Sequence, residues 1–254
     1  MKDISMEAAG IMSTAISDPF PLFTEEAIRQ MRAEVFSRKM LEKHQVGLDM
    51  ATNMIRGYCP ENTSFVYDAW DSPVVLGVLS KVAGIHLVPA MDVDVGHVNI
   101  LKLAFDWYSD NYTFVCVTML LGCAGMVGSE TAIRTGTGEV LKFRGLAMGT
   151  AIIMQGRYIE HQALKAFGGR ERTSMGTVLR PKSPFVYDDE TTIKPLLPST
   201  HKNTLYYQYA EYRLENLEER VRRQLKVIRQ QKKTHRDFDI AATREFLLER
   251  KSVY

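Results

Sequence analysis

The sequence feature that most constrains the fold is a dense series of short β-rich runs beginning at residue 85. Gly-containing turns such as residues 135–138 separate these runs, and no long helical pattern alternates with them. Parallel sheets need helical crossovers, so this order favours an antiparallel sandwich or jelly roll. The expected strands are residues 93–103, 112–121, 140–143, 150–155 and 173–179.

Helical patterns precede the β-rich region. Thr24 is a suitable N-cap for a helix that runs to about residue 41, and two acidic residues in its first turn complement the helix dipole. Pro73 at the first helical position and Gly84 at the end delimit a second helix, with Ser72 as its expected cap. Both helices are predicted to be packing elements and not catalytic ones.

The C-terminal region has the pattern of a basic amphipathic helix. Apolar residues recur at three- and four-residue spacing over residues 205–228, and Asp239 is suited to cap a last short helix through Leu248. One interpretation is a surface for nucleic acid or lipid. The other is a helix packed on the body or on a second subunit, which leaves open an oligomer formed through this helix. The second is favoured because acidic residues interleave with the basic ones, namely Glu211, Glu215, Glu218 and Glu219.

Length and composition allow a substantial buried core. The 254 residues fit one large domain with helical appendages. The expected division is a helical segment at residues 1–84, a β core at 85–186, and a connector with helices at 187–254. A net charge of +2 is too small to favour nucleic acid or an anionic membrane as principal partner.

The cysteines and the N-terminal composition bear on the cellular compartment. Cys59, Cys116 and Cys123 lie in apolar surroundings without metal-ligand spacing, which predicts reduced, buried thiols. The first ten residues mix charged and apolar side chains, and no apolar run approaches the length of a bilayer span. We therefore expect a cytoplasmic protein.

A small set of polar residues in the β-rich region is suited to binding a metal and a carboxylate. Arg172 and Ser174 alternate along a strand, so they point to the same face and could grip one carboxylate together. A hairpin through residues 168–169 would bring His161 beside the same pocket. Asp110 lies at the mouth of an earlier strand and supplies an acid for the same site.

Seven sequence blocks carry a more specific signal. They are FVYDAW at 65–70, DWYSDNYTFV at 106–115, GMVGSETAIRTG at 125–136, GRYIEHQAL at 156–164, RERTSM at 170–175, RPKSP at 180–184 and LYYQYAEY at 205–212. Together the blocks resemble fungal iron(II)/2-oxoglutarate-dependent dioxygenases, which are often encoded in secondary-metabolite clusters. The resemblance extends over most of the chain.

The resemblance implies a double-stranded β-helix, a cupin-like jelly roll, with iron held by a His-x-Asp pair and a distal histidine. By position, Asp110 matches the carboxylate ligand and His161 the distal histidine. Arg172 and Ser174 match the motif that grips the far carboxylate of 2-oxoglutarate. Tyr108 stands where the first histidine is expected. A phenol is a poor neutral donor, and the metal itself would have to drive its ionisation.

Two further features near Tyr108 concern the iron ligands. Residues 101–106 form a shorter connection than the loop expected by resemblance, either because the protein is truncated there or because the gene model omits an exon. His97 is an alternative ligand, but it belongs to a strand motif that the family shares and is therefore interpreted as structural.

These observations support two functions. The first is an oxidoreductase that uses iron(II), 2-oxoglutarate and dioxygen to oxidise a small organic substrate. The second is a non-catalytic relative, a pseudoenzyme that serves as a binding or supporting subunit, and Tyr108 motivates it. A nucleic-acid module built on the basic tail is a remote third. For the apolar residues nearest the expected site a core role is favoured over lining a substrate pocket; these are Trp107, Tyr112, Phe114 and Met148.

Overall fold

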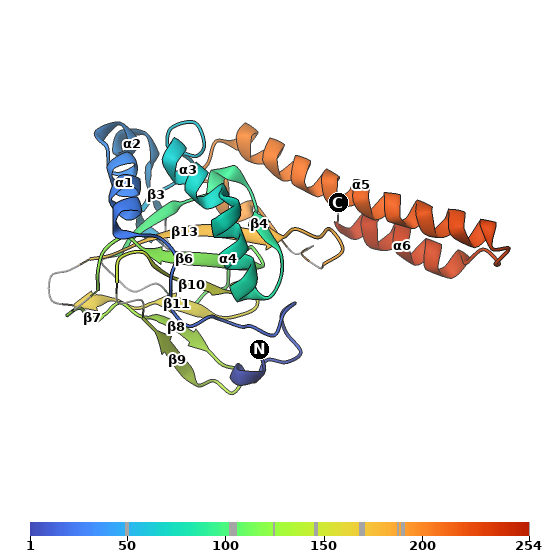
Figure 1. Cartoon of the computed structure of the whole chain (residues 1–254), viewed down its shortest axis with the longest axis horizontal. Helices are drawn as coiled ribbons and strands as arrows, with labels where there is room; N and C mark the ends of the chain where they lie inside the picture. Colours follow the sequence, from blue (N-terminus) through green and yellow to red (C-terminus); the bar gives the residue numbers. More distant parts are fainter. Residues whose placement is uncertain are drawn as a thin grey trace.

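The computed structural model describes residues 1–48, 51–101, 106–123, 125–144, 147–167, 171–186, 188 and 191–253. These residues form an α+β body from which a pair of long helices projects (Figure 1). The body contains a large antiparallel sheet, two smaller sheets on one side of it, and helices on the other side. The expected fold class, a jelly-roll core with flanking helices, is confirmed.

Within the described residues, the large sheet has eight strands, in the order β1-β10-β6-β13-β5-β3-β2, with β4 added alongside β13. The strands are β1 (Phe20–Pro21), β2 (Gln45–Leu48), β3 (Ala51–Ile55), β4 (Leu87–Pro89), β5 (His97–Leu101), β6 (Phe114–Met119), β10 (Thr150–Met154) and β13 (Arg172–Pro181). A second sheet joins β8 (Thr131–Arg134), β9 (Val140–Phe143) and β11 (His161–Ala163), and a third pairs β7 (Val127–Gly128) with β12 (Ala166–Phe167).

Strand β13 is the centre of the large sheet, because β6 pairs with one edge and β5 and β4 pair with the other. Its side chains alternate between two environments, as a strand requires. Met175 and Leu179 point into the core under the helices. Arg172 and Ser174 point to the opposite face, toward the smaller sheets. The sheet thus separates a hydrophobic layer from a polar cavity.

Four helices cover the outer face of the large sheet: α1 (Glu25–Val35), α2 (Arg38–His44), α3 (Ser64–Asp71) and α4 (Pro73–Ala83) (Figure 1). Ile28, Met31 and Trp70 are fully buried there against Phe114 and Met175 of the sheet. This apolar layer holds β6 and β13 in place, and both strands contribute side chains to the cavity on the other face.

The expected starts of two helices are confirmed, with one difference between them. The hydroxyl of Thr24 accepts a hydrogen bond from the Ala27 amide at 3.2 Å, as an N-cap does. Ser72 stands at the N-cap of α4, but its side chain makes no capping hydrogen bond. Pro73 begins that helix, and Gly84 ends it in the left-handed conformation with φ of 78°.

Several expected elements have different bounds, and two of them differ for a visible reason. The helix predicted to reach residue 41 ends at Val35, because Ser37 has an extended backbone (ψ 148°) and a new helix begins after it. The strand predicted at 93–103 begins only at His97, since residues 92–94 form a 3-10 turn. Its predicted end, together with most of the short 101–106 connection, lies outside the described residues.

The C-terminal region consists of α5 (Lys202–Lys233) and α6 (Ile240–Val253), which follow the 3-10 turn Lys194–Leu196. The first half of α5 packs on the body, where Leu205, Tyr212 and Arg213 are buried. Beyond Arg220 the helix leaves the body and runs beside α6 (Figure 1). The sequence predicted a helix packed on the body or on a second subunit, and only the first half of α5 packs on the body. Within the described part of the chain, every helix is too short or too polar to cross a bilayer.

Candidate active site

A cavity of about 70 Å³ lies between the large sheet and the smaller sheet that contains β11. Strand β13 contributes Arg172 and Ser174 to its wall, and β11 contributes His161. Tyr108 and Asp110 enter from the segment that precedes β6. All five residues singled out from the sequence therefore lie around one cavity.

Asp110 and His161 lie side by side, with 3.6 Å between Oδ2 and Nε2. The Asp110 amide donates to the Gly156 carbonyl at 2.9 Å, which places this loop against the turn before β11. Its Oδ2 is enclosed and, among the described residues, accepts no hydrogen bond. Burial raises the pKa of Asp110, and the nearby His161 opposes that rise. An enclosed carboxylate oxygen without a donor is suited to binding a cation.

The orientation of His161 is set by its other ring nitrogen. Nδ1 lies 2.9 Å from the carbonyl oxygen of Ile159, and a carbonyl can only accept, so Nδ1 carries the hydrogen. In the neutral ring Nε2 is then unprotonated, and Nε2 is the atom directed at Asp110. Both side chains line the cavity, so Nε2 of His161 and Oδ2 of Asp110 are neighbouring candidate donors for a cation.

Tyr108 contacts His161 through backbone hydrogen bonds and through its ring. The amides of Tyr108 and His161 each donate to the carbonyl of the other, at 3.1 and 2.9 Å. Their rings are 4.3 Å apart and inclined by 55°. Burial raises the pKa of Tyr108, Asp110 adds to the rise, and Arg172 opposes it. The side chain is therefore a neutral phenol at neutral pH.

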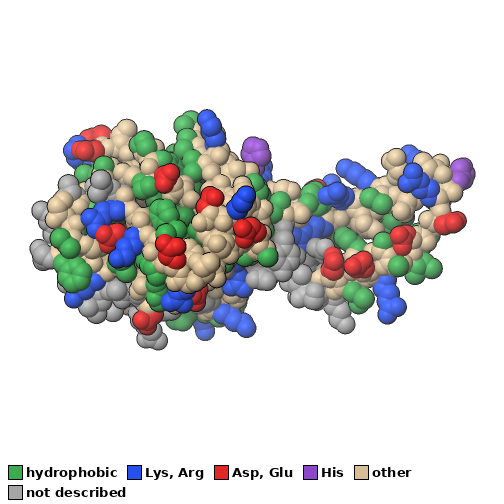
Figure 2. Space-filling model, turned by 90° about the horizontal axis from the view of Figure 1, so that it is seen from below, with side chains coloured by type: hydrophobic (Ala, Val, Ile, Leu, Met, Phe, Trp, Pro, Cys, Tyr) green, Lys and Arg blue, Asp and Glu red, His purple; other side chains and the backbone are tan. Residues whose placement is uncertain are grey.

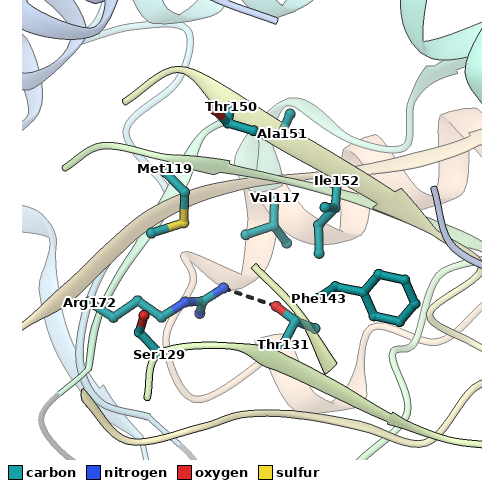
Figure 3. Close-up of a pocket in the computed structure, with 9 residues that line it drawn as sticks. All are labelled: Val117, Met119, Ser129, Thr131, Phe143, Thr150, Ala151, Ile152 and Arg172. Atoms are coloured by element: carbon teal, nitrogen blue, oxygen red, sulfur yellow. Dashed lines mark hydrogen bonds between the residues drawn. The ribbon is translucent and has the colours of Figure 1, made fainter. Parts of the chain in front are cut away.

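Arg172 and Ser174 line the same cavity from strand β13. One Nη of Arg172 donates to the Thr131 hydroxyl at 3.1 Å, across from the large sheet to β8 (Figure 3). Among the described residues, Nε of Arg172 and the Ser174 hydroxyl have no hydrogen-bond partner, although both are buried. Burial lowers the pKa of Arg172. A buried cation with unused donors is suited to binding a carboxylate.

A second, smaller hollow of about 10 Å³ continues from Arg172 between the sheets. It shares Val117, Thr131 and Arg172 with the main cavity. Met119 and Ile152 close it from the large sheet, while Ser129 and Phe143 lie on the other side (Figure 3). The Arg172 side chain thus borders both hollows, and it is buried.

The donor set fits a metal ion only in part. Asp110 and His161 supply two neighbouring donors, but no group of three or more His, Cys, Asp and Glu side chains within the described residues could hold a metal. Tyr108 or water would have to supply a further ligand. The carboxylate end fits better, because Arg172 and Ser174 offer unused donors at one place.

Solved structures share this arrangement of elements. A Pseudomonas putida prolyl-4-hydroxylase matches with a TM-score of 0.51 at 12% identity, over 67% of this chain and 94% of its own. The non-heme α-ketoglutarate-dependent carbocyclase SnoK from nogalamycin biosynthesis matches with a TM-score of 0.52 at 11% identity, over 65% of this chain and 79% of its own. The epimerase SnoN, also from nogalamycin biosynthesis, matches with a TM-score of 0.50 at 12% identity, over 66% of this chain and 76% of its own. No protein-family model and no curated protein sequence matches the chain.

The fold is that of the 2-oxoglutarate-dependent oxygenases. Identities of 11–12% support the fold and nothing finer. Within this oxygenase fold, the sequence expectation of a hairpin between His161 and Arg172 is wrong. Strand β11 pairs with β8, and β13 belongs to the large sheet, so the two residues face each other from different sheets. Residues 168–169 themselves lie outside the described part.

His97 is the first residue of strand β5 and lies on the wall of the same cavity. Its Nδ1 is 3.3 Å from the carbonyl oxygen of Asp94, and burial lowers its pKa. The ring also packs over Gly176, where a Cβ would lie 2.7 Å from Nε2. These contacts are consistent with the structural interpretation, although the ring borders the cavity.

Other lining residues were not singled out from the sequence. Asn99 follows His97 by two positions on β5, so strand alternation alone would have found it. Thr131 carried no sequence signal, because its pairing with Arg172 joins two sheets. The apolar residues for which a core role was favoured include Tyr112 and Phe114, which are core residues, and Met148, which packs against the core. Trp107 lies under the guanidinium of Arg134 at 4.5 Å.

Proposed function

We propose that this chain is an iron(II)- and 2-oxoglutarate-dependent dioxygenase-like oxidoreductase that acts on a small organic molecule. The observation that carries the proposal is that an adjacent acid and imidazole and a buried arginine line one cavity. Asp110 and His161 would hold the iron, with Tyr108 or water completing the set. Arg172 and Ser174 would hold the far carboxylate of 2-oxoglutarate.

Each part of the chain has a distinct task in this proposal. Iron(II) with 2-oxoglutarate and dioxygen supplies the oxidant for removing a substrate hydrogen. Arg172 orients the co-substrate, because a guanidinium binds a carboxylate in a fixed direction. The Ile159 carbonyl keeps His161 in the tautomer that leaves Nε2 free. The surrounding apolar wall, including Val115, Met154 and Val178, excludes water.

The biological setting we propose is fungal secondary metabolism in the cytoplasm. Its support is the sequence resemblance together with two structural neighbours whose own names place them in nogalamycin biosynthesis. Dioxygen and a small organic molecule are the partners that this chemistry needs.

A second candidate function is a non-catalytic binding subunit with the same fold. Two points favour it: by the sequence resemblance Tyr108 stands where the first histidine is expected, and the described residues lack a three-member metal-ligand group. The carboxylate end of the cavity would remain intact in such a protein, so it would still bind 2-oxoglutarate.

One experiment separates the two functions. Iron(II) and 2-oxoglutarate are added to the protein without oxygen, and the visible absorption band of the metal-bound keto acid is measured. The oxidoreductase should develop the band and, on admission of air, convert 2-oxoglutarate to succinate. Calorimetric binding of 2-oxoglutarate without the band or iron retention would overturn the enzyme proposal and support the binding subunit. Asp110→Ala is the matched control, because it removes one metal donor and leaves Arg172 in place.

A further inference from the structure

Helix α5 exposes an apolar stripe that nothing in the described structure covers. Leu214, Val221 and Leu225 are 59%, 38% and 43% exposed. Their spacing of seven and four residues places them on one side of α5. The residues that pack on the body, including Tyr212, Asn216 and Arg220, lie on the opposite side. The stripe is therefore free to contact another molecule.

The charges along α5 change sign between residues 219 and 220, close to where the helix leaves the body. Residues 211–219 contain four glutamates and one arginine, and that arginine, Arg213, is buried against the body. Residues 220–233 contain seven basic residues and no acidic one. Figure 2 shows both kinds of charge on the surface of the projecting part. The exposed surface of α5 is thus acidic near the body and basic toward its far end.

Existing ion pairs neutralise this gradient only weakly. Arg222 lies 2.6 Å from Glu218 and 3.9 Å from Glu219 of the same helix, and all three side chains are more than half exposed. Glu215 lies 3.9 Å from Arg180 of the body. Exposed pairs of this kind contribute little free energy, so a better-matched partner can replace them.

The helix is complementary to a second copy of itself in the antiparallel direction. Antiparallel contact places the acidic segment of each copy against the basic segment of the other, whereas parallel contact would oppose like charges. Leu214 and Ile228 are equally spaced about Val221, and so are Leu217 and Leu225. A two-fold axis at Val221 therefore pairs apolar residues with apolar residues along the stripe.

We propose that the chain forms a two-fold symmetric dimer in which two α5 helices pack antiparallel along Leu214, Val221 and Leu225. Helix α6, Ile240–Val253, would then be part of a four-helix assembly. This also accounts for the exposed apolar residues of α6. Ile240, Leu247 and Leu248 are 72%, 61% and 55% exposed in the single chain, and a short, solvated helix gains most of its stability from packing.

The full chain is tested by light scattering coupled to gel filtration. The wild type should have twice the mass of one chain. Val221→Glu should give a single-chain mass, because it places two carboxylates at the axis. Val74→Glu is the matched control, since Val74 is a helix residue of the body that is 75% exposed, and this variant should stay dimeric.

A charge exchange tests the direction of packing. Glu215→Lys with Glu219→Lys makes the exposed surface of α5 basic, and Lys226→Glu, Arg229→Glu, Lys232→Glu and Lys233→Glu together make residues 220–233 net acidic. Each variant alone should be monomeric with unchanged helix content by circular dichroism, and a mixture of the two should recover the double mass. The wild-type dimer should also weaken as salt is raised.

Three results would overturn the proposal: a monomeric wild type, a Val221→Glu variant that stays dimeric, or a mixture of charge variants that does not associate. A monomeric wild type that binds vesicles containing anionic lipid would identify the basic segment as a lipid surface instead.

Discussion

Nε2 of His161 lies 3.6 Å from Oδ2 of Asp110, although the two residues are separated by fifty positions and come from a strand and a loop. The contact is fixed at both ends by backbone hydrogen bonds, from Asp110 to Gly156 and between Tyr108 and His161. The loop before β6 and the strand β11 therefore form one unit, and substitutions in either should change the same property of the site.

The first prediction concerns the missing histidine. Tyr108→His should raise the affinity for iron(II) by on the order of tenfold or more, because it replaces a neutral phenol by a strong nitrogen donor beside Asp110 and His161. Anaerobic titration with iron(II) measures the change. Tyr108→Phe is the control and should gain nothing. Equal affinities of the histidine variant and the wild type would mean that residue 108 is not directed at the metal.

The second prediction uses Gly156, which lies directly against the Asp110 carboxylate. A Cβ at Gly156 would lie 1.8 Å from Oδ2 of Asp110, so Gly156→Ala must displace the carboxylate from its present position. We expect loss of iron binding with a retained fold, measured by iron titration and circular dichroism. Gly77→Ala is the control: its Cβ would meet nothing within 4 Å, and it should leave iron binding unchanged. Undiminished iron binding in Gly156→Ala would exclude Asp110 as a ligand.

The third prediction concerns 2-oxoglutarate. Arg172→Gln should weaken its binding roughly tenfold to a hundredfold, since a hydrogen bond to a charged group contributes about 1.5–3 kcal/mol. Ser174→Ala should have a smaller effect, because only a neutral donor is lost. Isothermal calorimetry gives both values. Arg144→Gln serves as the control, because Arg144 pairs with Glu130 and does not line the cavity. If Arg144→Gln and Arg172→Gln weaken binding equally, the cavity is not the binding site.

The fourth prediction compares two helix caps. Thr24→Ala should lower the free energy of unfolding by about 1 kcal/mol, because the Thr24 hydroxyl accepts the Ala27 amide. Ser72→Ala should have a much smaller effect, since the Ser72 side chain makes no capping hydrogen bond. Urea unfolding of the two variants measures the difference. The reverse order would mean that the hydroxyl of Ser72, and not that of Thr24, caps its helix in solution.

The fifth prediction concerns thiol reactivity. Burial raises the pKa of Cys59 to about 12, while a hydrogen bond with Thr63 opposes the rise. Because the thiolate is the reactive form, iodoacetamide should label Cys59 of the folded protein very slowly at pH 8, and the rate should rise about tenfold for each pH unit up to the pKa. Mass spectrometry of peptides from native and urea-treated protein gives the two rates. Rapid labelling of the native protein at pH 8 would contradict the burial of this thiol.

Much of the fold followed from local patterns in the sequence. Strand alternation correctly placed Arg172 and Ser174 on one face, because that rule depends only on neighbouring positions. Turn residues and β-rich runs correctly indicated a jelly roll. The break at Ser37 was missed, because apolar residues continue on both sides of it and the break is made by the extended backbone of a single residue.

The site was less predictable where residues from different sheets meet. The sequence indicated that His161 and Arg172 share a pocket, yet it suggested a hairpin where the structure has two facing sheets. Thr131 and Ser129 left no signal, since strand pairing over long separations is not encoded in local periodicity. The projection of α5 beyond Arg220 was also not predicted, because an amphipathic pattern does not say which molecule covers the apolar side.

The residues around the cavity come from different kinds of element. Arg172 belongs to a strand that is hydrogen-bonded on both edges, whereas Asp110 and Tyr108 are supplied by a loop. If the proposed function is right, changes in that loop would abolish oxidation while binding of 2-oxoglutarate survives. A single substitution in the loop would then be enough to turn a catalyst into a protein that only binds the metabolite.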